Sequence, residues 1–123
     1  MKKILIIDDE PAILEMYRLK FENSGFEVFT ALTGDDGLTI ANREHPDIIL
    51  LDIIMPKTNG LDVLKTLKEG DQTKSIPVLM TTNLPESTSG QKAKELGAEG
   101  YVVKAELEPK YLVTTVESYL KDQ

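Results

Sequence analysis

The middle of the chain reads Ile-Ile-Leu-Leu-Asp at residues 48–52. Four consecutive aliphatic residues have the length of a strand and show no polar alternation. This pattern indicates a strand buried on both faces, as in parallel sheets. Comparable aliphatic runs predict four further strands, at residues 4–7, 28–31, 78–80 and 101–103.

Segments with helical periodicity lie between and after these runs. They predict helices from Pro11 to a C-terminal cap at Gly25, over about 35–44, around 61–67, over about 85–96, and from Pro109 onward. The fourth segment contains Ser-Thr-Ser-Gly at residues 87–90, and these are poor helix formers. We therefore expect the fourth helix to be marginal and mobile.

The order of the elements is strand then helix, five times over. This alternation predicts an α/β fold with a parallel sheet and right-handed crossovers. No linker, repeat or low-complexity stretch interrupts it, and 123 residues suit one domain. We expect a single doubly wound domain of five βα units over residues 1–123.

Composition narrows the classes of function. The chain carries 14 basic and 21 acidic side chains, and its net charge of −7 disfavours direct binding to nucleic acid or to an anionic membrane surface. It has no cysteine, which excludes disulfides, thiolate catalysis and cysteine-bound zinc. The apolar run at residues 4–7 is too short for a membrane span or a signal-peptide core, so we expect a cytoplasmic protein.

Polar residues follow four of the five predicted strands, at the edge where ligands bind in open α/β sheets. They are Asp8, Asp9 and Glu10 after the first strand, Asp52 after the third, Thr81 and Thr82 after the fourth, and Lys104 after the fifth. Taken singly, the acidic triplet could cap a helix and Asp52 could be a turn residue. Their convergence on one edge of the sheet favours a functional site.

Carboxylates brought together at this edge repel one another, by roughly 4 kcal/mol at about 4 Å for an effective dielectric of about 20. A lysine or a metal must offset this repulsion, and Mg²⁺ prefers oxygen ligands of this kind. The combination suits phosphoryl transfer, which needs a nucleophile and cations around the transferred group. Asp52 is then the phospho-acceptor, and Lys104 with a threonine hydroxyl stabilises the developing charge.

The chain resembles the receiver domain of bacterial two-component response regulators. The resemblance extends from Lys2 to about Leu120 and is carried by four motifs in order: ILIIDDE at 4–10, LDIIMPKTNG at 51–60, PVLMTT at 77–82 and GAEGYVVK at 97–104. It implies the flavodoxin-like fold of that family, with strand order 2-1-3-4-5.

The resemblance also implies roles for the matching residues. Asp52 would receive the phosphoryl group from a histidine kinase or a phosphotransfer protein. Asp8, Asp9 and Asp52 would hold Mg²⁺ with the backbone carbonyl of Ile54, and Lys104 would pair with the phosphoryl group.

A conformational switch is implied as well. Thr82 matches the family's switch hydroxyl, and Tyr101 matches the aromatic residue that turns inward on activation. The change would reach an output face formed by the fourth helix, the fifth strand and the fifth helix, where a protein partner binds. We expect the chain to be a monomer or a weak dimer.

Three departures from the family's pattern lead to further predictions. Ala105 follows Lys104 where the family usually has proline in a cis bond; a cis bond before a non-proline residue costs about 3–4 kcal/mol, so we predict a trans bond. Asn83 stands where the family prefers a small residue and should narrow access to the phospho-acceptor. In the family, the positions of Ile54 and Leu84 flank the path of the attacking water and are often polar. Neither side chain can orient water by hydrogen bonding here, which predicts slow autodephosphorylation.

Two other functions suit a carboxylate on an α/β sheet. An aspartyl-phosphate phosphatase or phosphotransferase acting on small substrates usually carries its nucleophile after the first strand and adds a cap insertion, whereas Asp52 follows the third strand. In a flavodoxin-like cofactor binder, Asp8 and Asp9 would repel a phosphate. We therefore predict a protein that is not an enzyme toward other substrates and catalyses only its own phosphorylation and slow autodephosphorylation.

Overall fold

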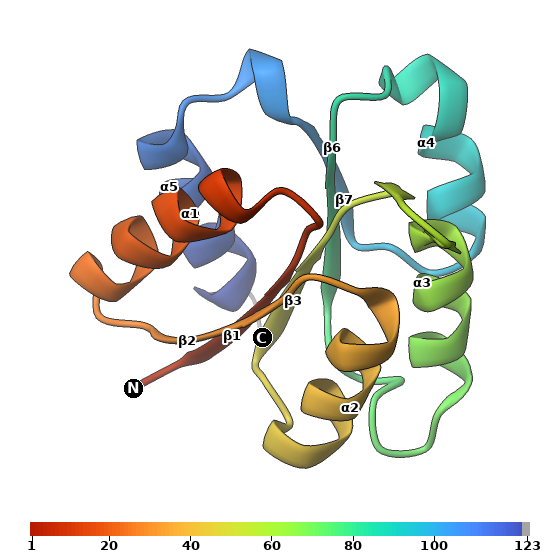
Figure 1. Ribbon diagram of the computed structural model, residues 1–123, viewed down its shortest axis with the longest axis horizontal. Coiled ribbons are helices and arrows are strands. Elements are labelled where there is room, and N and C mark those ends of the chain that lie inside the picture. Colours follow the sequence, from red (N-terminus) through yellow and green to blue (C-terminus); the bar gives the residue numbers. More distant parts are fainter. Residues whose placement is uncertain (122–123) are drawn as a thin grey trace.

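The five predicted strands form one parallel sheet in the computed structural model, which describes residues 1–121 (Figure 1). Across the sheet the strands are β2 (Glu27–Ala31), β1 (Lys3–Ile7), β3 (Ile48–Leu51), β6 (Val78–Thr82) and β7 (Gly100–Val103). Each strand is parallel to its neighbours. Counted within the sheet, this is the order 2-1-3-4-5, so the predicted fold class and strand order are confirmed.

Helices cover both faces of the sheet, as in a doubly wound fold (Figure 1). One face carries α1 (Pro11–Asn23) and α5 (Pro109–Lys121), and the other carries α2 (Gly34–Glu44), α3 (Gly60–Glu69) and α4 (Glu86–Glu95). Within residues 1–121, no helix combines the length and the hydrophobicity that crossing a lipid bilayer requires.

The central strands send successive side chains into two separate cores. In β1, Leu5 and Ile7 belong to the core under α2, α3 and α4, whereas Ile4 and Ile6 belong to the core under α1 and α5. The strand lacks polar alternation because neither of its faces meets water. Each fully buried aliphatic side chain contributes about 1.5–3 kcal/mol to folding.

Helix ends follow the local chemistry of the sequence. Pro11 opens α1, and Gly25 follows that helix with a φ of 93°, in the left-handed region that side chains disfavour. The side chain of Asn59 caps α3 by accepting a hydrogen bond from the backbone N–H of Leu61 at 2.8 Å. These signals mark where the chain leaves a helix and where it enters one.

The fourth helix, α4, forms over 10 residues despite its poor helix formers. The hydroxyl of Ser89, a buried residue, shares a hydrogen bond with the hydroxyl of Tyr101 on β7, and Ala93 is buried against the sheet. Tertiary contacts therefore compensate for weak intrinsic propensity. The expected mobility of this helix stays a prediction.

Three short features at the carboxyl edge of the sheet differ from the sequence prediction. Strand β6 extends to Thr82, beyond the strand predicted over 78–80, so Thr81 and Thr82 belong to the strand rather than to the loop after it. A small antiparallel hairpin of β4 (Ile54–Met55) and β5 (Thr58–Asn59) lies between β3 and α3. A 3₁₀ turn, η1 (Lys104–Glu106), follows β7. The two hairpin strands and η1 have too few residues to show a periodicity.

Candidate functional site

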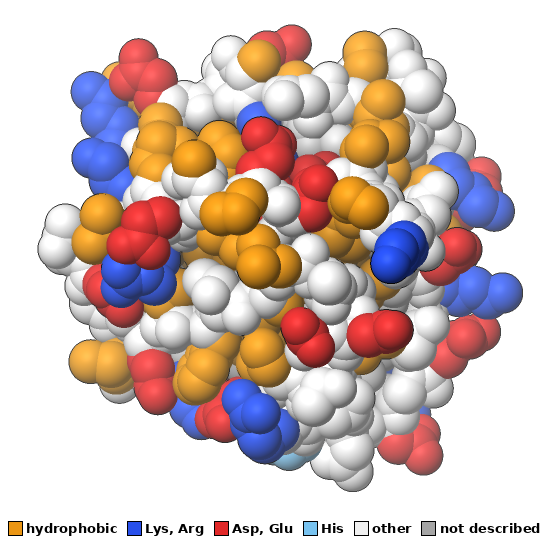
Figure 2. Space-filling model, in the orientation of Figure 1, with side chains coloured by type: hydrophobic (Ala, Val, Ile, Leu, Met, Phe, Trp, Pro, Cys, Tyr) orange, Lys and Arg blue, Asp and Glu red, His pale blue; other side chains and the backbone are white. Residues whose placement is uncertain are grey.

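The register of the sheet brings the predicted polar residues to one edge. Asp8 and Asp52 directly follow the last paired residues of β1 and β3, so they leave adjacent strands at the same level. Lys104 directly follows β7, and Thr82 is the last residue of β6. Figure 2 shows acidic side chains gathered over the ends of the central strands, with hydrophobic side chains around them.

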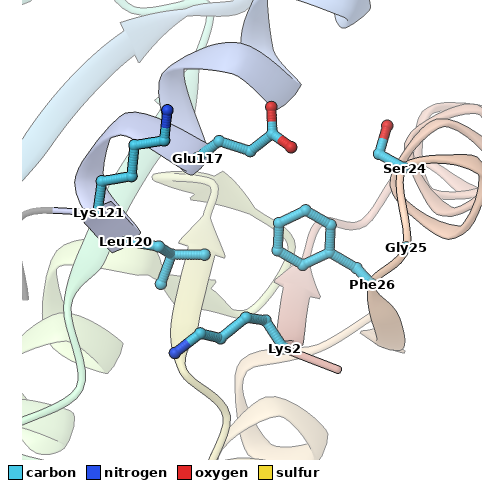
Figure 3. Close-up of a pocket in the computed structure, with 7 residues that line it drawn as sticks. All are labelled: Lys2, Ser24, Gly25, Phe26, Glu117, Leu120 and Lys121. Atoms are coloured by element: carbon cyan, nitrogen blue, oxygen red, sulfur yellow. The ribbon is translucent and has the colours of Figure 1, made fainter.

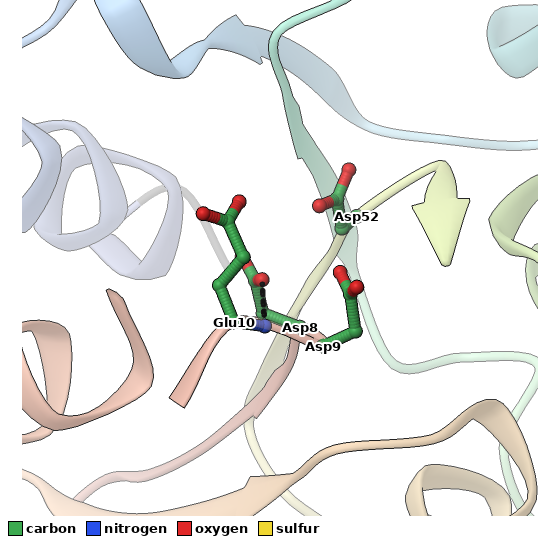
Figure 4. Close-up of side chains that lie close together, drawn as sticks. All are labelled: Asp8, Asp9, Glu10 and Asp52. Atoms are coloured by element: carbon green, nitrogen blue, oxygen red, sulfur yellow. Dashed lines mark hydrogen bonds between the residues drawn. The ribbon is translucent and has the colours of Figure 1, made fainter. Parts of the chain in front are cut away.

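Four carboxylates form a cluster at this edge (Figure 4). Asp8, Asp9, Glu10 and Asp52 each offer an oxygen, and these oxygens all lie within 4.8 Å of one another. Asp8 is 0% and Asp52 4% exposed, whereas Glu10 is exposed to solvent. Backbone groups hold the two buried carboxylates: Asp8 accepts from the N–H of Glu10 at 3.0 Å, and Asp52 accepts from the N–H of Ile54 at 3.2 Å.

The ammonium group of Lys104 lies inside the cluster. It donates hydrogen bonds to Asp8 and, at 2.8 Å, to Asp52, and it is 3.6 Å from a carboxylate oxygen of Glu10. The Lys104 side chain is only 6% exposed. Burial by itself lowers the pKa of Lys104, but the hydrogen bonds to Asp52 and Asp8 outweigh burial and raise this pKa above its ordinary value.

Negative charge exceeds positive charge in the cluster, since it holds four carboxylates and the Lys104 ammonium pairs with three of them, Asp8, Glu10 and Asp52. Burial raises the pKa of Asp8 above its ordinary value, against the hydrogen bonds from Lys104 and the Glu10 backbone, which lower it. A hard divalent cation would relieve this imbalance. Carboxylate oxygens at this spacing are ligands that Mg²⁺ prefers, so the donor set fits that ion.

A cavity of about 320 Å³ opens beside the cluster. It is lined by Asp9, Glu10, Asp52, Ile54, Thr82, Asn83, Leu84 and Lys104. Ile54, with 59% of its surface exposed, and Leu84 bring hydrocarbon to a cavity otherwise lined by polar groups. The phospho-acceptor candidate therefore faces a space lined by one cation, several carboxylates and two side chains that form no hydrogen bonds.

Gly60 is a residue of the site for which we predicted no role. A Cβ atom at this position would lie 1.9 Å from the backbone carbonyl oxygen of Asp52. Its N–H also donates to the carbonyl of Ile53 at 2.8 Å. The start of α3 can approach the acidic residue this closely only without a side chain at residue 60. The glycine is visible in the sequence, but only the packing reveals its reason.

The two predicted switch residues lie in different surroundings. Thr82 is fully buried and lines the cavity, where its hydroxyl accepts a hydrogen bond from the N–H of Leu84 at 3.4 Å. Tyr101 lies away from that cavity and packs toward α4. Its hydroxyl donates to the carbonyl of Leu84 at 2.9 Å and shares a hydrogen bond with Ser89 at 3.0 Å. Ser89, which the sequence indicated only as a poor helix former, thus contacts the predicted switch.

Two departures from the family pattern meet in one contact. The Lys104–Ala105 bond is trans, as predicted, since no peptide bond within residues 1–121 is cis. The side-chain oxygen of Asn83 accepts a hydrogen bond from the N–H of Ala105 at 3.0 Å. Nearby in β6, the hydroxyl of Thr81 is buried without a hydrogen-bond partner among the described residues, and it does not line the cavity.

Another cavity, of about 370 Å³, lies at the opposite edge of the sheet (Figure 3). Its lining includes Lys2, Phe26 and Glu117, and none of the predicted site residues. Among residues 1–121, Glu117 is the one acidic residue in its lining, so this part of the chain forms no carboxylate cluster there. The carboxylate cluster therefore borders the cavity beside Asp52 and not this one.

Comparison with known sequences identifies a family. A sequence profile described as the response regulator receiver domain matches residues 4–117. The probable transcriptional regulator ycf27 of Cyanophora paradoxa is 40% identical over 121 residues, which are 98% of this chain and 48% of that protein. The polar-differentiation response regulator DivK of Brucella ovis is 32% identical over 121 residues, 98% of each chain. The chain thus spans about half the length of the first relative and nearly all of the second.

Solved structures show the same likeness. A CheY-like receiver domain protein from Methanospirillum hungatei JF-1 superposes with a TM-score of 0.92 at 27% identity, covering 99% of this chain and 95% of that one. Chemotaxis protein CheY4 of Vibrio cholerae superposes with a TM-score of 0.90 at 32% identity, covering 96% of this chain and 98% of that one.

Proposed function

The chain belongs to the response regulator receiver domain family, and on this premise we propose that it is a signalling switch that accepts a phosphoryl group on Asp52. The donor is a histidine kinase or a phosphotransfer protein. One observation carries the proposal: the buried carboxylate of Asp52 borders the cavity and accepts a hydrogen bond from the Lys104 ammonium at 2.8 Å.

In the proposed reaction, a carboxylate oxygen of Asp52 attacks the phosphorus atom of the donor. The new O–P bond forms as the bond from phosphorus to the donor's nitrogen or oxygen breaks, and the leaving group takes that electron pair. The backbone N–H of Ile54 orients the attacking carboxylate. Lys104 moves part of its hydrogen bonding to the arriving phosphoryl oxygens and neutralises their charge.

The carboxylates of Asp8, Asp9 and Asp52, with the backbone carbonyl of Ile54, are the groups proposed to hold Mg²⁺. When bound, the ion supplies the positive charge that lets a phosphoryl group enter an acidic cavity. Lys104 by itself leaves three negative charges of the four carboxylates unbalanced. The proposal therefore requires the metal for phosphorylation.

The output of the switch is proposed to pass through Thr82 and Tyr101. The Thr82 hydroxyl lies at the cavity, and the hydrogen bonds of Tyr101 reach the start of α4. A shift of Thr82 toward the phosphoryl group would bias these contacts between two arrangements. The face formed by α4, β7 and α5 would then bind a protein partner, and the chain acts as a monomer or weak dimer.

The phosphorylated form is proposed to decay slowly, because Ile54 and Leu84 cannot orient an attacking water by hydrogen bonding. The chain catalyses its own phosphorylation and this slow hydrolysis, with no activity toward other substrates. The half-life of the phosphoprotein, measured by intact mass after removal of the donor, checks this. A half-life as short as that of a receiver with polar residues at both positions would contradict it.

The function is tested by incubating the protein with a small acyl-phosphate donor and Mg²⁺ and measuring intact mass. We expect one phosphoryl group per chain in the wild type and none in Asp52→Asn. Asp71→Asn is the matched control, since the Asp71 side chain is 92% exposed and remote from the cavity. Turnover of added phosphoesters without labelling would instead support the aspartyl-phosphate phosphatase or phosphotransferase alternative.

A further inference from the structure

We propose that Asn83 is a positioning residue that holds the Lys104 ammonium against Asp52 by tying together two connections at the edge of the sheet. This inference rests on the proposed function, because it concerns how the lysine is kept in place for the phosphoryl group. The contact that carries it joins residues 22 apart in the sequence: the side-chain oxygen of Asn83 accepts a hydrogen bond from the backbone N–H of Ala105 at 3.0 Å.

The sheet places these two connections side by side. Strands β6 and β7 are parallel neighbours, and their last residues, Thr82 and Val103, are paired. The first residues beyond them are Asn83 and Lys104. One connection then leads to α4 on one face of the sheet, and the other leads through η1 to α5 on the opposite face, so the two segments diverge after the site. A side chain that bridges them acts at the point where their separation is still small.

The donor of this hydrogen bond has no partner within its own turn. Ala105 is the second residue of η1, and the first N–H groups of a helix have no intrahelical acceptor. The residue before η1, Val103, has an apolar side chain and provides no cap. Asn83 supplies the missing acceptor from a different segment. A proline at residue 105 would have no N–H to donate, so Asn83 and Ala105 together form a contact that the usual family pattern could not.

The position of Lys104 depends on this arrangement. A lysine side chain has high rotational freedom, so the hydrogen bonds from its ammonium to Asp8 and Asp52 are better maintained when the backbone at residue 104 is held on both sides. Pairing within the sheet holds the residue before it, and the hydrogen bond from Ala105 to Asn83 holds the residue after it. Asn83 also lines the same cavity as Asp52 and Lys104, so its hydrogen bond to Ala105 lies close to the reacting groups.

The first test measures the accessibility of Lys104 without any phosphorylation. The protein is treated with a limiting acetylating reagent, and acetylation of each lysine is followed by peptide mass spectrometry. Asn83→Ala should raise the acetylation rate of Lys104 by roughly threefold to tenfold. Lys68, whose side chain is 16% exposed, serves as the internal reference and should not change. An unchanged rate at Lys104 would overturn the proposal.

Asn42→Ala is the matched control for this measurement. Asn42 is also an exposed asparagine with one side-chain hydrogen bond to the backbone, donated to the carbonyl of Leu38 at 2.9 Å. It lies on α2 and does not line the cavity. We expect the acetylation rate of Lys104 to remain at its wild-type value in this variant. An equal increase in both variants would mean a general loosening of the protein and would also overturn the proposal.

The second test asks whether Asn83 acts through Lys104. In the acyl-phosphate labelling assay, Asn83→Ala should slow phosphorylation of Asp52 by roughly threefold to tenfold, because displacement of Lys104 outweighs the wider access to Asp52 that a smaller side chain gives. It should cause no slowing when Lys104 is already replaced by methionine. The same factor in both backgrounds would show an independent effect and refute the proposal. If the wild type is not labelled at all, the proposed function fails. The acetylation of Lys104 still decides whether the hydrogen bond between Asn83 and Ala105 holds this lysine in place.

Discussion

At residue 8, burial and hydrogen bonding have opposite effects on the pKa of the Asp8 carboxyl. Asp8 is fully buried, and burial raises the pKa of its carboxyl, while the Lys104 ammonium and the N–H of Glu10 lower it by hydrogen bonding. Burial is the larger effect, so the folded protein binds the Asp8 proton more tightly than the unfolded chain does. This residue contributes most to stability below its unfolded pKa of 3.8, and the contribution is lost as pH rises through the higher folded pKa.

Asp8→Asn removes the free-energy cost of burying the ionised Asp8 carboxylate at neutral pH. The amide oxygen can still accept from the N–H of Glu10, while the buried negative charge disappears. In metal-free buffer at pH 7 we expect the free energy of unfolding to rise by on the order of 1 kcal/mol, with the gain shrinking as pH falls toward 4. Urea unfolding at several pH values measures it. A destabilised variant at pH 7 would mean that the pair with Lys104 outweighs burial.

Gly60 is the second residue whose environment leads to a prediction. Gly60→Ala would place a methyl group against the backbone carbonyl of Asp52, and backbone cannot move aside as a side chain can. We expect a loss of about 1–3 kcal/mol in urea unfolding, together with slower labelling of Asp52.

Gly90→Ala is the comparison for this change. There the added methyl group meets the side chain of Glu86, which can rotate away, and the residue lies within α4. We expect a gain of up to about 1 kcal/mol from improved helix propensity. Equal destabilisation by both alanines would show that the approach of Gly60 to Asp52 has no special cost.

At the scale of an element, α4 combines weak intrinsic propensity with specific tertiary contacts. Its sequence contains Ser-Thr-Ser-Gly, yet Ser89 and Ala93 are buried. The hydroxyl of Ser89 meets that of Tyr101, which also donates to the carbonyl of Leu84 just before the helix. The stability of α4 therefore depends on its contacts with β7.

Ser89→Ala tests this dependence. Loss of the hydrogen bond to Tyr101 should accelerate amide hydrogen exchange throughout α4, corresponding to about 1 kcal/mol of local stability. Ser87→Ala on the same helix is the control, since Ser87 is exposed and should leave exchange unchanged or slower. Exchange rates in α4 that are the same in wild type and Ser89→Ala would contradict the role of this contact.

At the scale of the whole molecule, stability and cation binding are linked. The carboxylate cluster forms only when β1 and β3 pair, so a cation that binds it favours the folded state. The proposed Mg²⁺ site should therefore stabilise the wild type by about 2.7 kcal/mol when free Mg²⁺ is about a hundredfold above its dissociation constant.

Thermal unfolding with MgCl₂, against NaCl of equal ionic strength, measures this stabilisation. Asp71→Asn should retain the full Mg²⁺-dependent increase in melting temperature. Asp9→Asn should lose most of it, because Asp9 belongs to the cluster and Asp71 does not. A wild-type melting temperature that is equal in the two salts would remove the metal from the proposed function.

The fold class and the five strands of the main sheet could be predicted from the sequence. Runs such as Ile-Ile-Leu-Leu at 48–51 report burial on both faces of a strand, and the alternation of strands with helices leaves few topologies. The order of strands came from the family resemblance and not from the spacing of elements. The hairpin after Asp52 and the turn at Lys104 escaped prediction because two or three residues show no periodicity.

The sequence by itself determined the five strands of the main sheet, the burial of the central strands on both faces, and that carboxylates, hydroxyls and one lysine stand at the carboxyl ends of these strands. It could do so because burial and strand direction leave local patterns. Only the tertiary structure decided that Lys104 donates hydrogen bonds to both Asp8 and Asp52. The same holds for the hydrogen bond between the hydroxyls of Ser89 and Tyr101, and for the one that Asn83 accepts from the N–H of Ala105. Such contacts depend on how distant segments lie relative to one another to within an ångström, and no local pattern of residues encodes that distance.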